Sequence, residues 1–223
     1  MNALRMLAVT LILLISVKTS QAQTIQEDQL FKRLENHTVK LYESVEGNPF
    51  AFGQVCTAVV IEKQENMSML FTAGHCVNEK DRSYMVLSDK PYFVIKKFVS
   101  KYSDLAVLFV SGSIADKDPA PITSSRLSIG DKLYNYSYPG TVVFKKTGGF
   151  VNEDWIAGSV SFVVIPGCSG SGIYNDKGQL EGIAVSYNRD EPISYYVPIF
   201  EYMRFFHQLE VDGELPSSEN GVG

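Results

Sequence analysis

Residues 54–76, QVCTAVVIEKQENMSMLFTAGHC, contain two runs rich in apolar and β-branched side chains, Gln54–Lys63 and Met67–Cys76. The polar residues 64–66 separate the runs and are typical of a turn. Two such runs joined by a short polar connection predict a pair of antiparallel strands. We therefore take this hairpin as the starting point for an all-β fold.

Similar strand-like runs lie on both sides of the hairpin, and turn residues separate them. They are VKLYESV (39–45), SYMVLSD (83–89), YFVIKKFVS (92–100), DLAVLFV (104–110), KLYNYSY (132–138), TVVFKKT (141–147), WIAGSVSFVVI (155–165), SGIYN (171–175) and LEGIAVSY (180–187). A polar, proline-containing stretch, 111–128, divides them into two halves. We predict two packed all-β units, the first over about 39–112 and the second over about 128–197.

Helices are expected only at the two ends of this β region. Residues 23–38 begin with an amphipathic pattern that predicts a short N-terminal helical segment. Residues 198–209 start with a proline, which suits the first turn of a closing helix. The polar residues 210–223 are expected to form a flexible tail.

The chain starts with the pattern of an export signal, 1–22. Arg5 precedes an apolar stretch, Met6–Val17, and the small residues around Ala22 favour cleavage before Gln23. The alternative is a membrane anchor, but a spanning helix needs about 20 apolar residues. We therefore expect a secreted or periplasmic protein that has no membrane association after cleavage.

The charge of the chain gives no indication of a nucleic-acid partner. Cleavage removes two of its 20 basic side chains and none of its 25 acidic ones, which leaves a net charge of −7. Lys and Arg form no blocks along the sequence. Nucleic-acid binding is therefore not expected.

The three cysteines predict one disulfide. Cys56 and Cys76 lie on the two neighbouring runs of the hairpin, where antiparallel strands can bring them within bridging distance. An exported chain favours this bridge, which leaves Cys168 as a free thiol. The alternative is three free thiols.

Two motifs in the first half carry candidate acid–base residues. His75 follows an apolar run and stands among small residues in TAGHC, where an imidazole can act as a general base. Asp104 opens an apolar strand in SDLAVL, where an unpaired charge is costly. Taken singly, His75 could be structural and Asp104 could cap a turn.

A third motif, PGCSGSG (166–172), carries a candidate nucleophile. Its glycines allow a tight turn that exposes the Ser169 hydroxyl and directs the amides of Gly167 and Ser169 inward as an oxyanion hole. The alternatives are a glycine-serine loop or an anion-binding turn without chemistry. Cys168 and Ser171 are alternative nucleophiles, but the glycine that follows Ser169 favours Ser169.

TAGHC, SDLAVL and PGCSGSG, in this order, resemble the motifs of trypsin-like serine peptidases. SIGDKLYNYSYPG (128–140) and PGCSGSGIYNDKGQLEGIAVSY (166–187) are similar to the compact bacterial branch that includes the HtrA-type proteases, here without a PDZ domain. The resemblance covers about residues 50–200. It implies two six-stranded β-barrels, a triad of His75, Asp104 and Ser169, a polypeptide substrate, and no metal or cofactor.

The resemblance also places a primary substrate pocket. Its expected lining is Val163, Val164, Ser186, Tyr187 and Asn188. No acidic side chain is apparent at its base, which favours a small or medium apolar residue over Lys or Arg.

Cys168 departs from the family pattern, which usually has Asp or Asn at this position.

The function expected is a secreted serine endopeptidase, and the alternative is a catalytically silent module that binds a peptide or a partner. An α/β-hydrolase would need the order Ser, acid, His and alternating helices, and the chain has neither.

Overall fold

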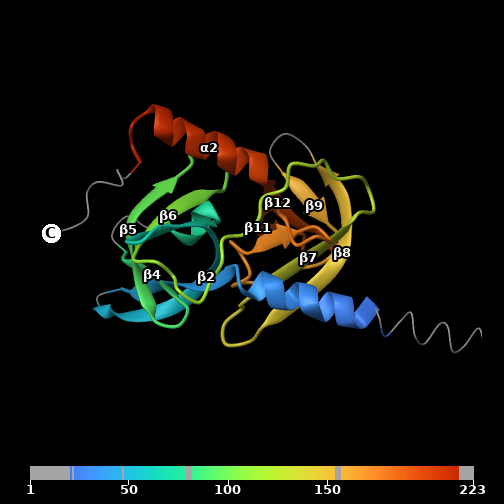
Figure 1. The fold of residues 1–223 in the computed structure, drawn as a ribbon, viewed down its shortest axis with the longest axis horizontal. Coiled ribbons are helices and arrows are strands. Elements are labelled where there is room, and N and C mark those ends of the chain that lie inside the picture. Colours follow the sequence, from blue (N-terminus) through green and yellow to red (C-terminus); the bar gives the residue numbers. More distant parts are fainter. Residues whose placement is uncertain (1–20, 22, 47, 79–81, 154–156, 216–223) are drawn as a thin grey trace, which may run out of the picture.

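Two closed antiparallel β-barrels form the body of the protein, and a helix lies at each end of the described chain (Figure 1). The structure is a computed structural model that describes residues 21, 23–46, 48–78, 82–153 and 157–215. Of the expected export signal, residues 1–22, only Gln21 is among the described residues. No helix in these described ranges is long and apolar enough to cross a membrane.

The first barrel contains six strands in the order β1-β2-β3-β6-β5-β4, and β4 closes on β1. The strands are β1 (Thr38–Val45), β2 (Asn48–Lys63), β3 (Met67–Thr72), β4 (Tyr84–Leu87), β5 (Pro91–Val99) and β6 (Ala106–Ser111). A short 3₁₀ turn, η1 (Gly74–Cys76), follows β3. The hairpin predicted from residues 54–76 is the β2–β3 pair of this barrel.

The second barrel also has six strands, in the order β10-β11-β12-β9-β8-β7. They are β7 (Lys132–Ser137), β8 (Phe144–Glu153), β9 (Gly158–Val160), β10 (Gly172–Tyr174), β11 (Leu180–Tyr187) and β12 (Ser194–Pro198). The predicted all-β class with two six-stranded barrels is thus confirmed. In the chain between the barrels, Ile122 forms an isolated β-bridge with Leu180 of the second barrel.

Strands β3 and β6 are buried on both faces, which explains their continuous apolar sequences. Because successive side chains point to opposite faces, Leu70 and Leu108 lie in the core of the first barrel. Phe71 and Val107 instead join a second cluster that also contains Tyr134 of the other barrel. The two barrels therefore share a core along their interface.

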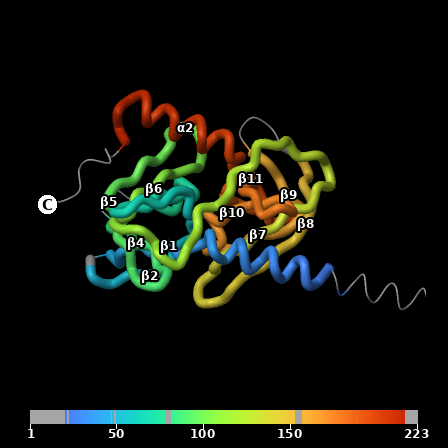
Figure 2. The backbone as a smooth tube through the Cα atoms, viewed as in Figure 1, coloured from blue at the N-terminus to red at the C-terminus, as the bar shows by residue number. Residues whose placement is uncertain are grey.

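The two helices extend this shared core. Residues 23–35 form the N-terminal helix, and α2 (Ile199–Val211) follows β12 directly. The tube in Figure 2 shows the N-terminal helix running beside the second barrel, while α2 reaches over the first. Phe31 packs edge-on against Tyr134, and Tyr202 stacks on Phe71 at 4.7 Å. Each helix thus contacts the barrel that is more distant from it in the sequence.

Candidate active site

His75 and Asp104 are brought together by two turns at the same end of the first barrel. His75 lies on η1, just after β3, and Asp104 lies just before β6. These strands are neighbours in the barrel, with Thr72 opposite Ala106. A Cβ on Gly74 would lie only 3.0 Å from both Asp104 Oδ1 and the Leu105 amide, so the absence of a side chain permits this close approach.

The Asp104 carboxylate holds His75 at two points. Its Oδ1 accepts the backbone N–H of His75 at 2.7 Å, and its Oδ2 lies 2.7 Å from the imidazole Nδ1. Burial by itself raises the pKa of this carboxyl, but the hydrogen bonds from the His75 side chain and backbone outweigh it and hold the pKa below its ordinary value. Asp104 is therefore ionised at neutral pH, so Nδ1 carries the shared hydrogen and Nε2 can accept a proton.

Ser169 lies on a tight turn between β9 and β10. Gly167 and Gly170 in this turn have φ values of +93° and +83°, a region that favours glycine. The Cys168 side chain points the other way, into the core of the second barrel, where it is fully buried as a free thiol. Burial raises the pKa of this thiol, which disfavours the nucleophilic thiolate.

The backbone amides of this turn differ in whether the described residues supply them with an acceptor. The Cys168 amide donates to the Ile165 carbonyl at 2.9 Å, and the Ser171 amide donates to the Cys168 carbonyl at 3.0 Å. Within the described part of the chain, the amides of Gly167 and Ser169 have no acceptor. These are the two amides that the sequence predicted as an oxyanion hole.

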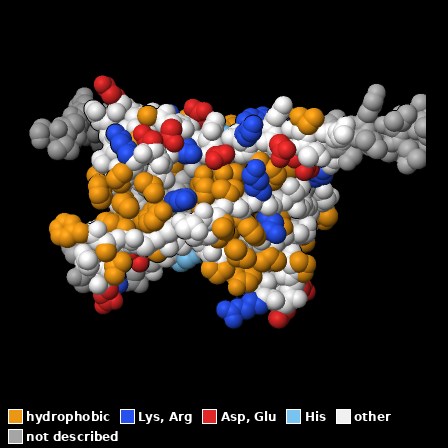
Figure 3. Space-filling model, turned by 90° about the horizontal axis from the view of Figure 1, so that it is seen from below, with side chains coloured by type: hydrophobic (Ala, Val, Ile, Leu, Met, Phe, Trp, Pro, Cys, Tyr) orange, Lys and Arg blue, Asp and Glu red, His pale blue; other side chains and the backbone are white. Residues whose placement is uncertain are grey.

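A cleft of about 560 Å³ joins the candidate residues of the two barrels. Its lining comprises Glu43, Val55, Cys56, His75, Cys76, Val164, Ile165, Pro166, Gly167, Ser169, Val185, Ser186, Tyr187 and Arg189. Figure 3 shows the molecule hollowed between two lobes, with hydrophobic side chains on both and a histidine at the edge of the hollow. Asp104 lies behind His75 and does not line the cleft.

His75 and Ser169 line the same cleft, but no hydrogen bond connects the imidazole to the Ser169 hydroxyl in the described structure. The His75 side chain is 47% exposed. An exposed ring that one carboxylate holds at Nδ1 has its Nε2 available to a neighbour. Hydrogen bonds between candidate catalytic groups are often long in structures without substrate and shorten only when the complex forms.

Three of the five expected pocket residues line the cleft, namely Val164, Ser186 and Tyr187, whereas Val163 and Asn188 do not. Val185, which is not one of these five residues, also lines the cleft, and it lies where β11 shifts its register between Ala184 and Ser186. A bulge turns one side chain away from the regular alternation, and no motif in the sequence signals it.

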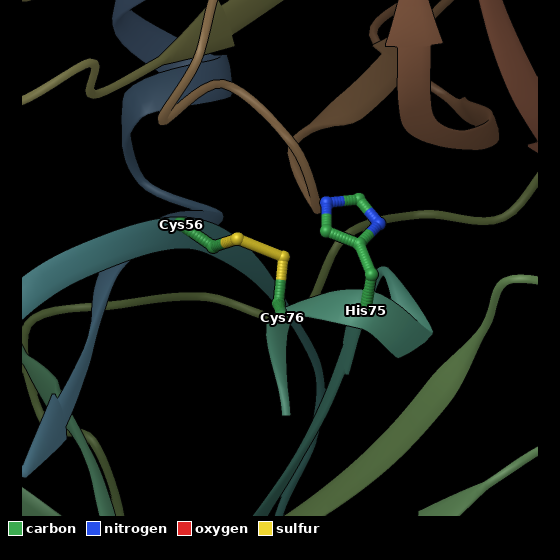
Figure 4. Close-up of side chains that lie close together, drawn as sticks. All are labelled: Cys56, His75 and Cys76. Carbon is green, nitrogen blue, oxygen red and sulfur yellow. A yellow bond between two sulfur atoms is a disulfide. The ribbon is translucent and has the colours of Figure 1, made fainter. Parts of the chain in front are cut away.

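The Cys56–Cys76 disulfide is present, as predicted, with a Cα–Cα distance of 6.0 Å. It joins β2 to η1 beside His75 (Figure 4). The two sulfur atoms and a ring nitrogen of His75 lie within 4.8 Å of one another. Because the sulfurs are bonded to each other, they are not thiolates, and thiolates are the form in which cysteine binds metals. We therefore do not interpret this cluster as a metal centre.

Comparison with solved structures identifies the fold. The chain is similar to the crystal structure of the serine endoprotease from Yersinia pestis, with a TM-score of 0.69 and 20% sequence identity over 83% of this chain and 67% of that one. Two closed six-stranded barrels with this similarity are the trypsin-like serine peptidase fold. No protein-family model and no curated protein matches the sequence.

Proposed function

We propose that the protein is a serine endopeptidase in which Ser169 is the nucleophile, His75 the general base and Asp104 the group that orients His75. The observation that carries this proposal is the two-point contact of Asp104 with His75 on the cleft that Ser169 also lines. An ionised carboxylate in that position fixes the imidazole tautomer and stabilises the imidazolium formed during turnover.

The proposed reaction has two stages. The Ser169 oxygen attacks the carbonyl carbon of the scissile peptide bond while His75 Nε2 takes the hydroxyl proton, and the imidazolium then gives this proton to the departing amine. A water molecule, deprotonated by the same nitrogen, attacks the resulting ester, and the imidazolium returns this proton to the Ser169 oxygen as the carboxylic acid product leaves. The bond that forms with Ser169 in the first stage breaks in the second, so the enzyme is regenerated.

The free amides of Gly167 and Ser169 support the oxyanion part of this mechanism. Both lack an acceptor in the described structure, and the charge on the substrate oxygen develops during attack. A single donor of this kind contributes about 3 kcal/mol to stabilisation of the transition state.

The lining of the cleft supports a preference for an apolar residue before the scissile bond. Val164, Ile165 and Val185 supply apolar surface near Ser169, and the charged side chains of the lining are Glu43, His75 when protonated, and Arg189. A polypeptide is the substrate that this chemistry and this cleft would take.

The disulfide supports action in an oxidising compartment, either secreted or periplasmic, because such bonds are rare in the cytosol. Alkylation of freshly isolated, denatured protein should then find one free thiol, Cys168. Three free thiols would argue against this localisation.

Labelling with a fluorophosphonate probe tests the nucleophile. Wild-type protein should be labelled and should cleave a denatured protein substrate, and Ser169→Ala should lose both activities because the attacking oxygen is gone. Ser171→Ala is the matched control in the same turn, since the Ser171 side chain is buried and accepts a hydrogen bond from Asn135. Labelling that persists in Ser169→Ala but disappears in Cys168→Ala would move the nucleophile to the thiol.

The same experiment separates a peptidase from a silent binding module. A wild-type protein that binds an unfolded polypeptide but is neither labelled nor able to cleave it would contradict the proposed enzyme. A correctly folded protein, verified by its circular dichroism, is required for that conclusion.

A further inference from the structure

Thr57 belongs to the first barrel, yet it contacts the Ser169 turn of the second. It lies in β2 next to Cys56, and its side chain is fully buried. The Thr57 amide donates to the Ser169 carbonyl at 2.9 Å, and its hydroxyl donates to the Gly167 carbonyl at 3.0 Å. The same hydroxyl oxygen accepts the Tyr138 amide at 3.2 Å. One side chain thus joins two separate segments of the second barrel.

These contacts fix the peptide unit between the two proposed oxyanion donors. The Gly167 carbonyl and the Cys168 amide belong to the same planar peptide unit and point away from opposite edges of it. The Cys168 amide donates to the Ile165 carbonyl. The plane is therefore held at both ends, by Thr57 and by Ile165. The free amides of Gly167 and Ser169 belong to the peptide units immediately before and after this one in the chain. The orientation of this peptide unit therefore helps to set the direction in which each amide points.

Thr57 is also bonded to the strand that leads to His75. Its carbonyl accepts the Thr72 hydroxyl at 2.9 Å, and Thr72 is the last residue of β3. Gly170 packs against this contact, because a Cβ there would lie 2.1 Å from both the Thr57 carbonyl oxygen and the Thr72 hydroxyl. The turn that carries the proposed nucleophile and the strand that leads to the proposed base thus meet at Thr57.

We propose that Thr57 is a positioning residue that aligns the oxyanion donors of the second barrel with His75 of the first. This inference rests on the proposed peptidase function, which it deepens. The hydroxyl is the essential group, because it is the atom of Thr57 that both holds the Gly167 carbonyl and accepts from Tyr138. Thr57 itself does not line the cleft, so it acts through the turn.

The test replaces the hydroxyl while keeping the shape of the side chain. Thr57→Val should lower kcat by about 10- to 100-fold, since removal of one entire oxyanion donor costs about 100- to 1,000-fold. KM should change by less than about twofold, because the lost interaction stabilises the transition state rather than the bound substrate. Thr57→Ser, which restores the hydroxyl, should recover most of kcat.

Thr38→Val is the matched control. Thr38 is another fully buried threonine of the first barrel, and its hydroxyl donates to the Leu34 carbonyl at 2.7 Å. Thr38→Val therefore removes a comparable hydrogen bond in a different place. It should keep the wild-type kcat. If Thr57→Val does not fold, Thr57→Cys, whose thiol is a weaker donor, takes its place with the same expected direction.

Amide hydrogen exchange at Cys168 supplies a readout that does not depend on activity. Exchange should be faster in Thr57→Val than in wild type, Thr57→Ser and Thr38→Val, because the held peptide plane is released. Wild-type kcat in Thr57→Val, no recovery in Thr57→Ser, or an equal loss in Thr38→Val would overturn the proposal. An inactive wild type with the expected exchange pattern would instead refute the peptidase function and leave the positioning role intact.

Discussion

His37 is buried where the N-terminal helix joins the first barrel, and its ring lies at a tilt beside Tyr174. Its Nδ1–H donates to the Asp118 carbonyl at 2.9 Å. Burial lowers the pKa of this imidazole below 6.5, against the opposing effect of the hydrogen bond to Asp118. The unfolded chain therefore binds a proton at a higher pH than the folded chain does.

We predict that the free energy of unfolding decreases as the pH falls from 6.5 toward the pKa of His37 in the folded protein. Well above pH 6.5 the imidazole is neutral in both states, so this contribution is constant. His37→Gln should remove this part of the dependence in urea unfolding between about pH 5 and pH 8. His207→Gln, on an exposed face of α2, is the control. The same pH profile in His37→Gln and wild type would contradict the prediction.

Single motifs predicted the region of the site better than its full lining. In the sequence, His75 follows an apolar strand and Asp104 opens one. The structure brings His75 Nδ1 to 2.7 Å from Asp104 Oδ2. Thr57 carried no comparable signal, because a threonine inside an apolar strand is ordinary in a sheet. Its importance arises only from the turn that folds against it from the other barrel.

The β2–η1 connection depends on the disulfide between Cys56 and Cys76, which closes a loop over a sequence separation of 20 residues. Loss of such a cross-link raises the entropy of the unfolded chain. We predict that Cys56→Ser/Cys76→Ser lowers the free energy of unfolding by about 3 kcal/mol. Chemical denaturation with and without reductant measures this change. Reductant should destabilise wild type and have no effect on the double variant, and equal responses would contradict the prediction.

Some element boundaries could not be predicted because they depend on distant partners. WIAGSVSFVVI was predicted as one strand, yet β9 ends at Val160 and the following residues turn toward the cleft. Conversely, β2 begins at Asn48, earlier than the predicted run, because residues 52–54 pair with β1. Apolar periodicity indicates burial, but it does not indicate which neighbour is available for pairing.

Each of the two helices packs on the barrel that does not adjoin it in the sequence, and so links the two barrels. The N-terminal helix leads into the first barrel but packs on Tyr134 of the second, and α2 leaves the second barrel but stacks on Phe71 of the first. The Tyr202 hydroxyl adds a 2.7 Å hydrogen bond to the Thr72 carbonyl. The sequence predicted both helices, whereas their docking sites depend on surfaces that only the assembled barrels present.

We predict that Phe31→Ala lowers the free energy of unfolding by about 3 kcal/mol, because it removes a nearly fully buried ring from the shared core. Spectroscopic probes in the two barrels should report the same lowered midpoint. Ile25→Ala on the same helix, where the side chain is 59% exposed, should change stability by less than about 0.5 kcal/mol. Separate midpoints for the two barrels in Phe31→Ala would show that the core is not shared.

The position of the N-terminal helix has a consequence for biosynthesis. Leu30, Phe31 and Leu34 leave the ribosome early, but Tyr134, which helps to cover them, lies on β7, a strand that starts only at Lys132. Chains generally fold from the N-terminus as they emerge. During translation the part of this apolar helix face that packs on Tyr134 therefore stays uncovered until the second half of the chain has been made.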